Sequence, residues 1–175
     1  MSNPIVGGVI KLGMDSIDTD VISPAKFGLS ATPDAEEWKL IKETAFGGIR
    51  KDLYKDVKPG DILVAGKNYG YGSHRVRVNT VMKELGFAAV IAESFARIYF
   101  RNSIAIGFPA YEVPGITQLV EEGDRLEVDL NKLRVTNLTN GKSLSFKPHS
   151  DMVKRILETG GIFEMMRERL AKEGV

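Results

Sequence analysis

The residues best suited to chemistry in this sequence lie in one glycine-rich segment, Gly70-Tyr-Gly-Ser-His-Arg75. The segment follows a continuous apolar run and precedes a helical pattern, so it is expected to join a buried strand to a helix N-terminus. Backbone N–H groups and the helix dipole favour an anion at such a place. Ser73 offers a hydroxyl that can cap the helix or face a ligand, and Arg75 offers a planar fork for a carboxylate. A small anionic substrate is therefore the expected ligand.

The same segment also has plainer interpretations. A glycine-rich turn with a serine is most often only a helix cap. The dinucleotide pattern G-x-G-x-x-G is incomplete because Arg75 stands in place of the third glycine, and no phosphate-binding Walker pattern occurs. A histidine beside a cap, such as His74, is more often a surface residue than a catalytic one. His149, at a second predicted helix start, is a weaker catalytic candidate still.

Acidic residues form a second polar group, at Asp15, Asp18 and Asp20. They resemble a calcium loop only superficially, since the required glycine and the distal glutamate are missing. We interpret them as a polar turn that packs beside the site.

The composition excludes several function classes. The chain has 175 residues, 43% of them hydrophobic, which fits one domain over residues 1–175. With 24 Lys+Arg against 23 Asp+Glu, the net charge of +1 gives no basic surface for nucleic acid. No apolar run approaches the ~18 residues of a membrane span, and the start lacks a signal peptide, so a cytoplasmic location is expected. The absence of cysteine excludes disulfides, thiolate zinc sites and an iron–sulfur cluster held by this chain's own thiolates.

The elements that must position the glycine-rich segment follow a strand–helix alternation. Strands are expected over residues 6–12, 62–65 and 88–92, separated by loops and helices. The helices are expected from a Thr32-Pro33 cap to residue 45, over residues 78–85, and over residues 95–100 with Ser94 as cap. This order favours a parallel sheet with right-handed crossovers.

The C-terminal third has a different pattern. Residues 125–130, 133–138 and 143–146 are expected to form a small antiparallel layer, with Asn140-Gly141 as a hairpin turn. Helices are expected over residues 152–157 and 163–170, separated by Gly160-Gly161. The large aromatic residues at helical spacing are assigned to the core; they are Trp38, Phe95, Tyr99 and Phe100.

Motifs along the whole chain carry a family resemblance. They are Asp18-Thr-Asp20 with Ile22-Ser-Pro-Ala-Lys26, Val57-Lys-Pro-Gly-Asp61, Gly66-Lys-Asn-Tyr-Gly70 with Gly72-Ser73 and Arg75, Ala89-Val-Ile-Ala-Glu-Ser-Phe-Ala-Arg-Ile98, Arg101-Asn102, Gly107 and Gly160-Gly161. With these motifs in this order, the chain resembles the small subunits of isopropylmalate isomerase (3-isopropylmalate dehydratase) and their homoaconitase relatives. These are swivel domains of the aconitase superfamily.

The resemblance implies an α/β fold, a three-layer β/β/α swivelling domain with a mostly parallel central sheet, a small antiparallel layer and C-terminal helices. It also implies a hydro-lyase of leucine biosynthesis that isomerises a hydroxy dicarboxylic acid by dehydration and rehydration. The chain would hold no cofactor itself and would be active only with a large subunit that carries an iron–sulfur cluster. Self-association of the isolated chain stays open.

The resemblance also assigns site residues. Ser73 matches the catalytic serine that, as an alkoxide, takes the carbon-bound proton, and Arg75 matches the arginine that grips a substrate carboxylate. The other expected substrate-binding residues are Gly72, His74, Lys26, Phe27, Gly28, Leu29 and Ser30.

The chain departs from the family pattern at two places. Where the family usually reads Gly-Ser-Ser-Arg-Glu-His, this chain reads Gly72-Ser-His-Arg-Val-Arg77, which makes the pocket rim more basic. The specificity loop reads Phe27-Gly-Leu-Ser30, where isopropylmalate enzymes tend to show Tyr-Leu-Arg and homoaconitases Tyr-Leu-Val-Tyr. A homoaconitase, citrate-type or dimethylmalate-type dehydratase subunit and a non-catalytic binding or regulatory swivel domain therefore remain alternatives.

Overall fold

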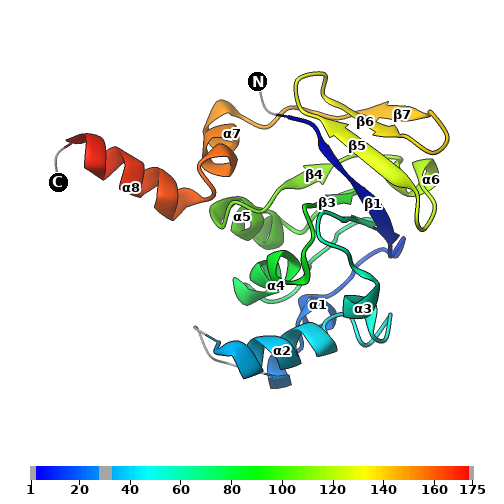
Figure 1. Cartoon of the computed structure of the whole chain (residues 1–175), viewed down its shortest axis with the longest axis horizontal. Coiled ribbons are helices and arrows are strands. Elements are labelled where there is room, and N and C mark those ends of the chain that lie inside the picture. Colours follow the sequence, from blue (N-terminus) through cyan, green and yellow to red (C-terminus); the bar gives the residue numbers. More distant parts are fainter. Residues whose placement is uncertain (1–2, 28–32, 174–175) are drawn as a thin grey trace.

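A computed structural model describes residues 3–27 and 33–173 of the chain (Figure 1). Over these residues the strands are β1 (Ile5–Lys11), β2 (Ile62–Ala65), β3 (Ala89–Ala92), β4 (Ala110–Glu112), β5 (Arg125–Asp129), β6 (Arg134–Asn137) and β7 (Ser143–Ser145). The helices are α1 (Thr19–Ile22), the 3₁₀ helix η1 (Ala25–Phe27), α2 (Ala35–Thr44), α3 (Leu53–Asp56), α4 (Arg77–Leu85), α5 (Arg97–Ala105), α6 (Ile116–Leu119), α7 (Asp151–Glu158) and α8 (Ile162–Glu173).

The strands form one sheet in the order β4-β3-β2-β1-β5-β6-β7. The strands β1 to β4 are parallel, as the strand–helix alternation predicted for β1, β2 and β3, whereas β4 was not predicted. The strands β5, β6 and β7 are antiparallel, as the turn at Asn140-Gly141 predicted. Strand β1 joins the two halves, since it pairs parallel with β2 and antiparallel with β5. The antiparallel strands thus continue the parallel sheet.

The alternation of side chains along β2 explains how one sheet makes three layers. Leu63 packs with the helices on one face, in a core that includes Val81 and Met82 of α4. Its neighbours Ile62 and Val64 pack on the opposite face, against side chains of the antiparallel half. Because every residue of β2 is buried, each of these apolar side chains stabilises the fold by about 1.5–3 kcal/mol. The predicted β/β/α architecture is therefore confirmed.

The beginning of α2 differs from the prediction. Asp34, rather than Thr32, is the N-cap, and Thr32 lies outside the described residues. The Asp34 carboxylate accepts from the Glu37 backbone N–H at 2.9 Å, and the Glu37 carboxylate accepts from the Asp34 N–H at 3.1 Å. This capping box satisfies two N–H groups at once, which explains why the helix begins there.

The predicted cap of α5 was also wrong. The helix begins at Arg97, and Ser94 makes no cap bond to it. The Ser94 hydroxyl instead accepts from the backbone N–H of Asn68 at 2.9 Å, across 26 residues of sequence. A further difference is α1, which is helical where a loop was expected, because the Asp18 side chain caps it.

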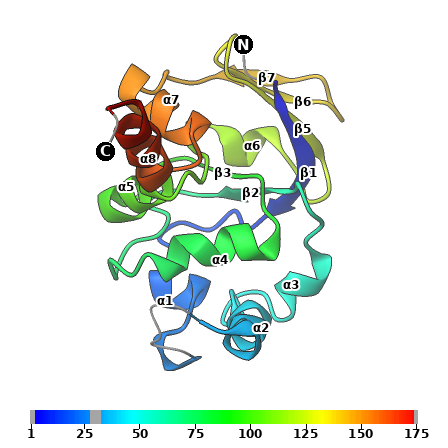
Figure 2. The same ribbon diagram turned by 60° about the vertical axis from the view of Figure 1, so that its left-hand side comes forward.

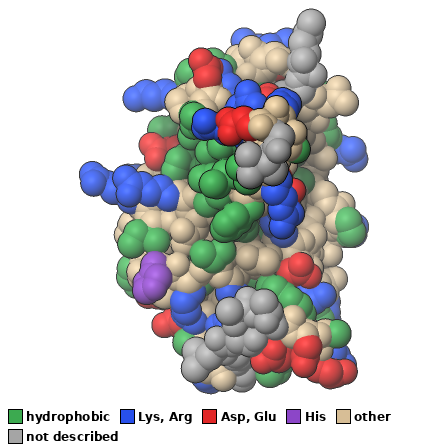
Figure 3. Space-filling model, turned by 90° about the vertical axis from the view of Figure 1, so that its left-hand side faces the viewer, with side chains coloured by type: hydrophobic (Ala, Val, Ile, Leu, Met, Phe, Trp, Pro, Cys, Tyr) green, Lys and Arg blue, Asp and Glu red, His purple; other side chains and the backbone are tan. Residues whose placement is uncertain are grey.

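The C-terminal helices α7 and α8 follow each other with a break at Gly160-Gly161, as predicted. Helix α8 projects from the body of the molecule and buries none of its residues (Figure 1). On the face that carries α8, hydrophobic side chains gather in the centre with Lys and Arg side chains around them (Figure 3). None of the helices described is both long and apolar enough to span a bilayer.

Candidate active site

The glycine-rich loop runs from the end of β2 to the start of α4 and is fixed by contacts with distant segments. The Asp15 carboxylate accepts from the Lys67 backbone N–H at 2.6 Å. The hydroxyl of Ser94, in the segment after β3, accepts from the Asn68 backbone N–H. Farther along, the carbonyl of Tyr71 accepts from the Thr19 N–H at 2.9 Å. The loop is therefore held between α1 and the segment after β3, above the carboxyl ends of the parallel strands.

Gly70 allows the loop to lie directly on a buried aromatic pair. Its φ angle is +78°, and a Cβ atom there would lie 2.3 Å from Cγ of Tyr99. The rings of Tyr69 and Tyr99 are buried and meet edge to face with 4.9 Å between their centroids. Burial raises the pKa of Tyr99 and that of Tyr69, so both phenols stay neutral. The assignment of Tyr99 to the core is confirmed.

Ser73 is the residue on which the hydrogen bonds of the loop converge. Its backbone N–H donates to the Thr19 hydroxyl at 2.8 Å. Its own hydroxyl oxygen accepts from Nε of Arg75 at 3.0 Å and from the Arg75 backbone N–H at 3.3 Å. It is not a helix cap, because the N-cap of α4 is Val76, which makes no side-chain bond. Two N–H donors on one oxygen, one of them cationic, stabilise negative charge there.

Arg75 is oriented by the acidic turn. Its Nη2 group pairs with the Asp20 carboxylate, and the Asp18 carboxylate fixes the turn by accepting from the Asp20 N–H at 2.6 Å. Asp15, as described above, holds the other end of the loop. The prediction that these acidic residues pack beside the glycine-rich loop is thus confirmed, although Asp18 and Asp20 belong to the start of α1 rather than to a turn. The Nη1 group of Arg75 is buried and has no hydrogen-bond partner among residues 3–27 and 33–173, so its donors remain unsatisfied in the absence of a ligand.

The remaining predicted site residues are distributed around this centre. Gly72 has φ +110°, and a Cβ there would lie 2.8 Å from the Thr19 hydroxyl. His74 is exposed, and its carbonyl accepts from Nδ2 of Asn102 at 3.0 Å. Lys26 is exposed in η1, which ends at Phe27. The three predicted residues that lie outside the described residues are Gly28, Leu29 and Ser30.

Sequence reasoning missed Thr19 and Asn102 as contacts of the loop. Thr19 stands in the Asp18-Thr-Asp20 motif, which the sequence singled out, but nothing local indicates that its hydroxyl accepts from Ser73. Asn102 follows Arg101 in another motif, and its contact with His74 spans 28 residues. Both contacts depend on the tertiary fold.

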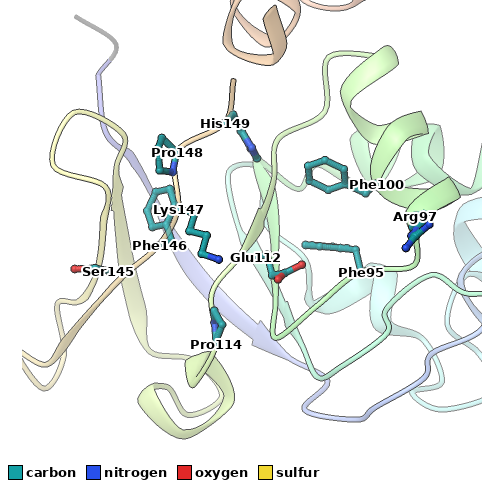
Figure 4. Close-up of a pocket in the computed structure, with 10 residues that line it drawn as sticks. All are labelled: Phe95, Arg97, Phe100, Glu112, Pro114, Ser145, Phe146, Lys147, Pro148 and His149. Carbon is teal, nitrogen blue, oxygen red and sulfur yellow. The ribbon is translucent and has the colours of Figure 1, made fainter. Parts of the chain in front are cut away.

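A separate pocket of about 680 Å³ lies between α5, the end of β4 and the segment after β7 (Figure 4). Phe95 and Phe100 line one side, and Phe146 and Pro148 line the other. Of the residues considered for chemistry from the sequence, His149 lines it, and the residues assigned to catalysis and substrate binding do not. Its aromatic walls explain why Phe95 and Phe100 are only partly buried members of the core.

His149 forms part of the wall of this pocket and has a structural role. Its ring stacks on Tyr111 with 5.1 Å between centroids and contacts Phe100 at 5.6 Å. Its Nε2 atom lies 3.1 Å from the carbonyl oxygen of Ala110. Because a carbonyl oxygen only accepts hydrogen bonds, Nε2 must carry the proton to make this bond. Burial, together with Lys154, lowers the pKa of His149 despite this bond.

A pH dependence of stability follows from His149. Folding lowers the pKa of His149 below its ordinary value of about 6.5. At pH values just below 6.5 the unfolded chain therefore binds more protons than the folded chain, so the free energy of unfolding falls as the pH drops through 6.5. Between pH 7.5 and 5.5 we expect the Tm of the wild type to fall by about 1–3 °C more than that of His149→Phe, which keeps an aromatic ring at this position but cannot titrate. His74→Gln, at an exposed position, should keep the wild-type loss. Equal losses in wild type and His149→Phe would contradict this role.

Known proteins are similar to this chain in both sequence and structure. Residues 36–111 match the family model described as the aconitase C-terminal domain. The chain is 40% identical to the 3-isopropylmalate dehydratase small subunit of Thermodesulfovibrio yellowstonii, over 98% of both chains. It is also 40% identical to the isopropylmalate/citramalate isomerase small subunit of Methanocaldococcus jannaschii, over 98% of this chain and 99% of that one. A crystal structure of 3-isopropylmalate dehydratase from the same archaeon superposes with a TM-score of 0.87, 31% identity and 98% coverage of both chains.

Proposed function

The chain belongs to the family of 3-isopropylmalate dehydratase small subunits, and from this premise we propose that it is the small subunit of a heteromeric hydro-lyase of leucine biosynthesis. Its substrate would be an isopropylmalate-like hydroxy dicarboxylic acid. The observation that carries the assignment of the site is the environment of Ser73, whose hydroxyl oxygen accepts from two N–H groups of Arg75. The similarity to the relatives described above confirms the family predicted from the motifs. The cytoplasm is the place of action we propose.

Dehydration of a hydroxy acid breaks a C–H bond on one carbon and a C–O bond on the next. We assign the proton transfer to Ser73: its oxygen, as the alkoxide, takes the carbon-bound proton while the C=C bond forms and the C–O bond breaks, and the departing hydroxide becomes water by taking a proton from solvent. In the return step a water molecule gives one proton to solvent and adds as hydroxide to the carbon that lost its hydrogen, while Ser73 gives its proton to the carbon that lost its hydroxyl. A serine oxygen can accept a proton only when negative charge on it is stabilised, and the Nε and backbone N–H groups of Arg75 supply that stabilisation.

Arg75 also provides a group for the substrate. Its Nε is engaged by Ser73 and its Nη2 by Asp20, so the side chain is fixed in orientation before a ligand arrives. The buried, unpartnered Nη1 can then donate to a substrate carboxylate. Holding the carboxylate on the same side chain that contacts the base places the C–H bond close to Ser73.

The residues of this chain do not fit an iron–sulfur cluster. The sequence contains no cysteine, and no group of three His, Asp or Glu side chains suited to a metal occurs among residues 3–27 and 33–173. We therefore propose that the cluster expected for this family resides on the large subunit. This chain contributes the base and the carboxylate contact.

The substrate class is tested with the chain and its cognate large subunit, mixed in equal amounts and assayed against a panel of hydroxy acids. The panel contains isopropylmalate, citramalate, dimethylmalate, citrate and homocitrate. We expect the highest kcat/KM with an alkyl-substituted malate such as isopropylmalate. Absence of turnover with every acid, in a mixture shown to contain the assembled complex, would reject the proposed function.

A further inference from the structure

Two neighbouring arginines in the candidate site have buried nitrogens without acceptors. These are Nη1 of Arg75 and both Nε and Nη2 of Arg77. No hydrogen bond or ion pair satisfies them in the part of the chain that the structure describes. Buried donors of a charged group are strongly disfavoured when they lack a partner, so their presence together points to a missing acceptor.

The position of Arg77 makes its charge still less favourable. It is the first residue of α4, at the positive end of the helix, and no acidic residue occupies the first turn. Burial and the nearby charge of Arg75 lower the pKa of Arg77. A cation here is therefore opposed by the helix, by its neighbour and by desolvation.

The acidic groups nearby leave this excess of positive charge uncompensated. Asp20, at the start of α1, is paired with Nη2 of Arg75. Glu37 of α2 attracts Arg77 electrostatically but makes no ion pair with it. Both α1 and α2 contact α4, and both lie below it in Figure 2. The acidic groups that attract the two guanidinium groups thus lie on elements packed on the same side of α4, and the two arginines are close enough to repel each other, so one anion between them would satisfy both.

We propose that Arg77 is a second substrate-binding side chain, and that Arg75 and Arg77 together hold one carboxylate of the hydroxy acid. This inference rests on the proposed function, because the carboxylate is that of the hydro-lyase substrate. Contact between Arg75 and Ser73 places the shared carboxylate beside the base.

The test is steady-state kinetics of the reconstituted enzyme with isopropylmalate. Arg77→Met is expected to raise KM by about 10- to 100-fold, the usual effect of losing a hydrogen bond to a charged group, with kcat within about threefold. Arg77→Lys keeps the charge and should recover part of the affinity. Arg167→Met, which removes an exposed arginine of α8, should leave KM unchanged. An unchanged KM in Arg77→Met would overturn the proposal.

A binding measurement separates failure of this inference from failure of the proposed function. Isothermal titration of the full-length chain, alone and mixed with the large subunit, uses 2-isopropylmalate as the probe at constant ionic strength. Saturable binding to wild type that weakens about 10-fold or more in Arg77→Met supports the anion site even when no turnover is found. Equal binding by both proteins, or no binding by wild type in either form, overturns the site whatever the turnover.

Discussion

Replacing Ser73 with alanine is expected to lower kcat of the reconstituted enzyme by about 10²–10⁴-fold, the usual contribution of a positioned proton-transfer group. The KM should stay within a few-fold of wild type, because Arg75 still presents Nη1 to the substrate. The fold should be unaffected, since the Ser73 backbone N–H retains its bond to Thr19. Steady-state kinetics and a thermal melt of the same preparation check both statements.

The control for this variant is Ser143→Ala, which removes an exposed hydroxyl from β7. It should leave both kcat and Tm at wild-type values. If Ser73→Ala kept full turnover, the assignment of the base would be wrong. A lower Tm together with a lower kcat would show instead that Ser73 supports the loop.

Replacing Gly70 with alanine is expected to have the largest effect on stability. At φ +78° an alanine is strained by about 1–2 kcal/mol, and its Cβ would lie 2.3 Å from the ring of Tyr99. Because Tyr99 is fully buried, the contact is relieved only by shifting the loop or the core, which adds about 1–3 kcal/mol. The free energy of unfolding, measured by urea titration, should fall by about 2–5 kcal/mol. Turnover should fall too, since the loop carries Ser73.

Gly141→Ala separates the two contributions. Gly141 has a similar φ angle of +74°, but a Cβ there would meet nothing within 4 Å. The free energy of unfolding of Gly141→Ala should therefore fall only by the backbone strain of about 1–2 kcal/mol. Equal losses for Gly70→Ala and Gly141→Ala would show that the contact with Tyr99 contributes nothing.

The parts of the site that are close in sequence were predictable. The apolar run of β2 and the period of α4 define the two elements that flank the loop, and both have nearly the predicted bounds. Ser73 and Arg75 are two residues apart, so local spacing alone brings them together. The Asp20 partner of Arg75 is 55 residues away, and no periodicity in either segment indicates that they meet.

The errors at helix starts have a common physical origin. Ser94 has the hydroxyl of a good N-cap, but the Asn68 N–H competes for it and lies on the loop beside it. At α2 the capping box with Glu37 favours Asp34. The union of the two half-sheets could not be predicted, because it depends on β1 pairing with β5 across more than a hundred residues. Sequence patterns define strands, whereas their partners depend on the packed fold.

The central claim is that this chain supplies the base to a hydro-lyase completed by a large subunit. The most direct test mixes the purified subunits and follows the interconversion of 2- and 3-isopropylmalate. Conversion is predicted in the wild-type mixture, with none by either subunit alone and almost none when the small subunit carries Ser73→Ala. No conversion by an assembled wild-type complex, or undiminished conversion with Ser73→Ala, would contradict the claim.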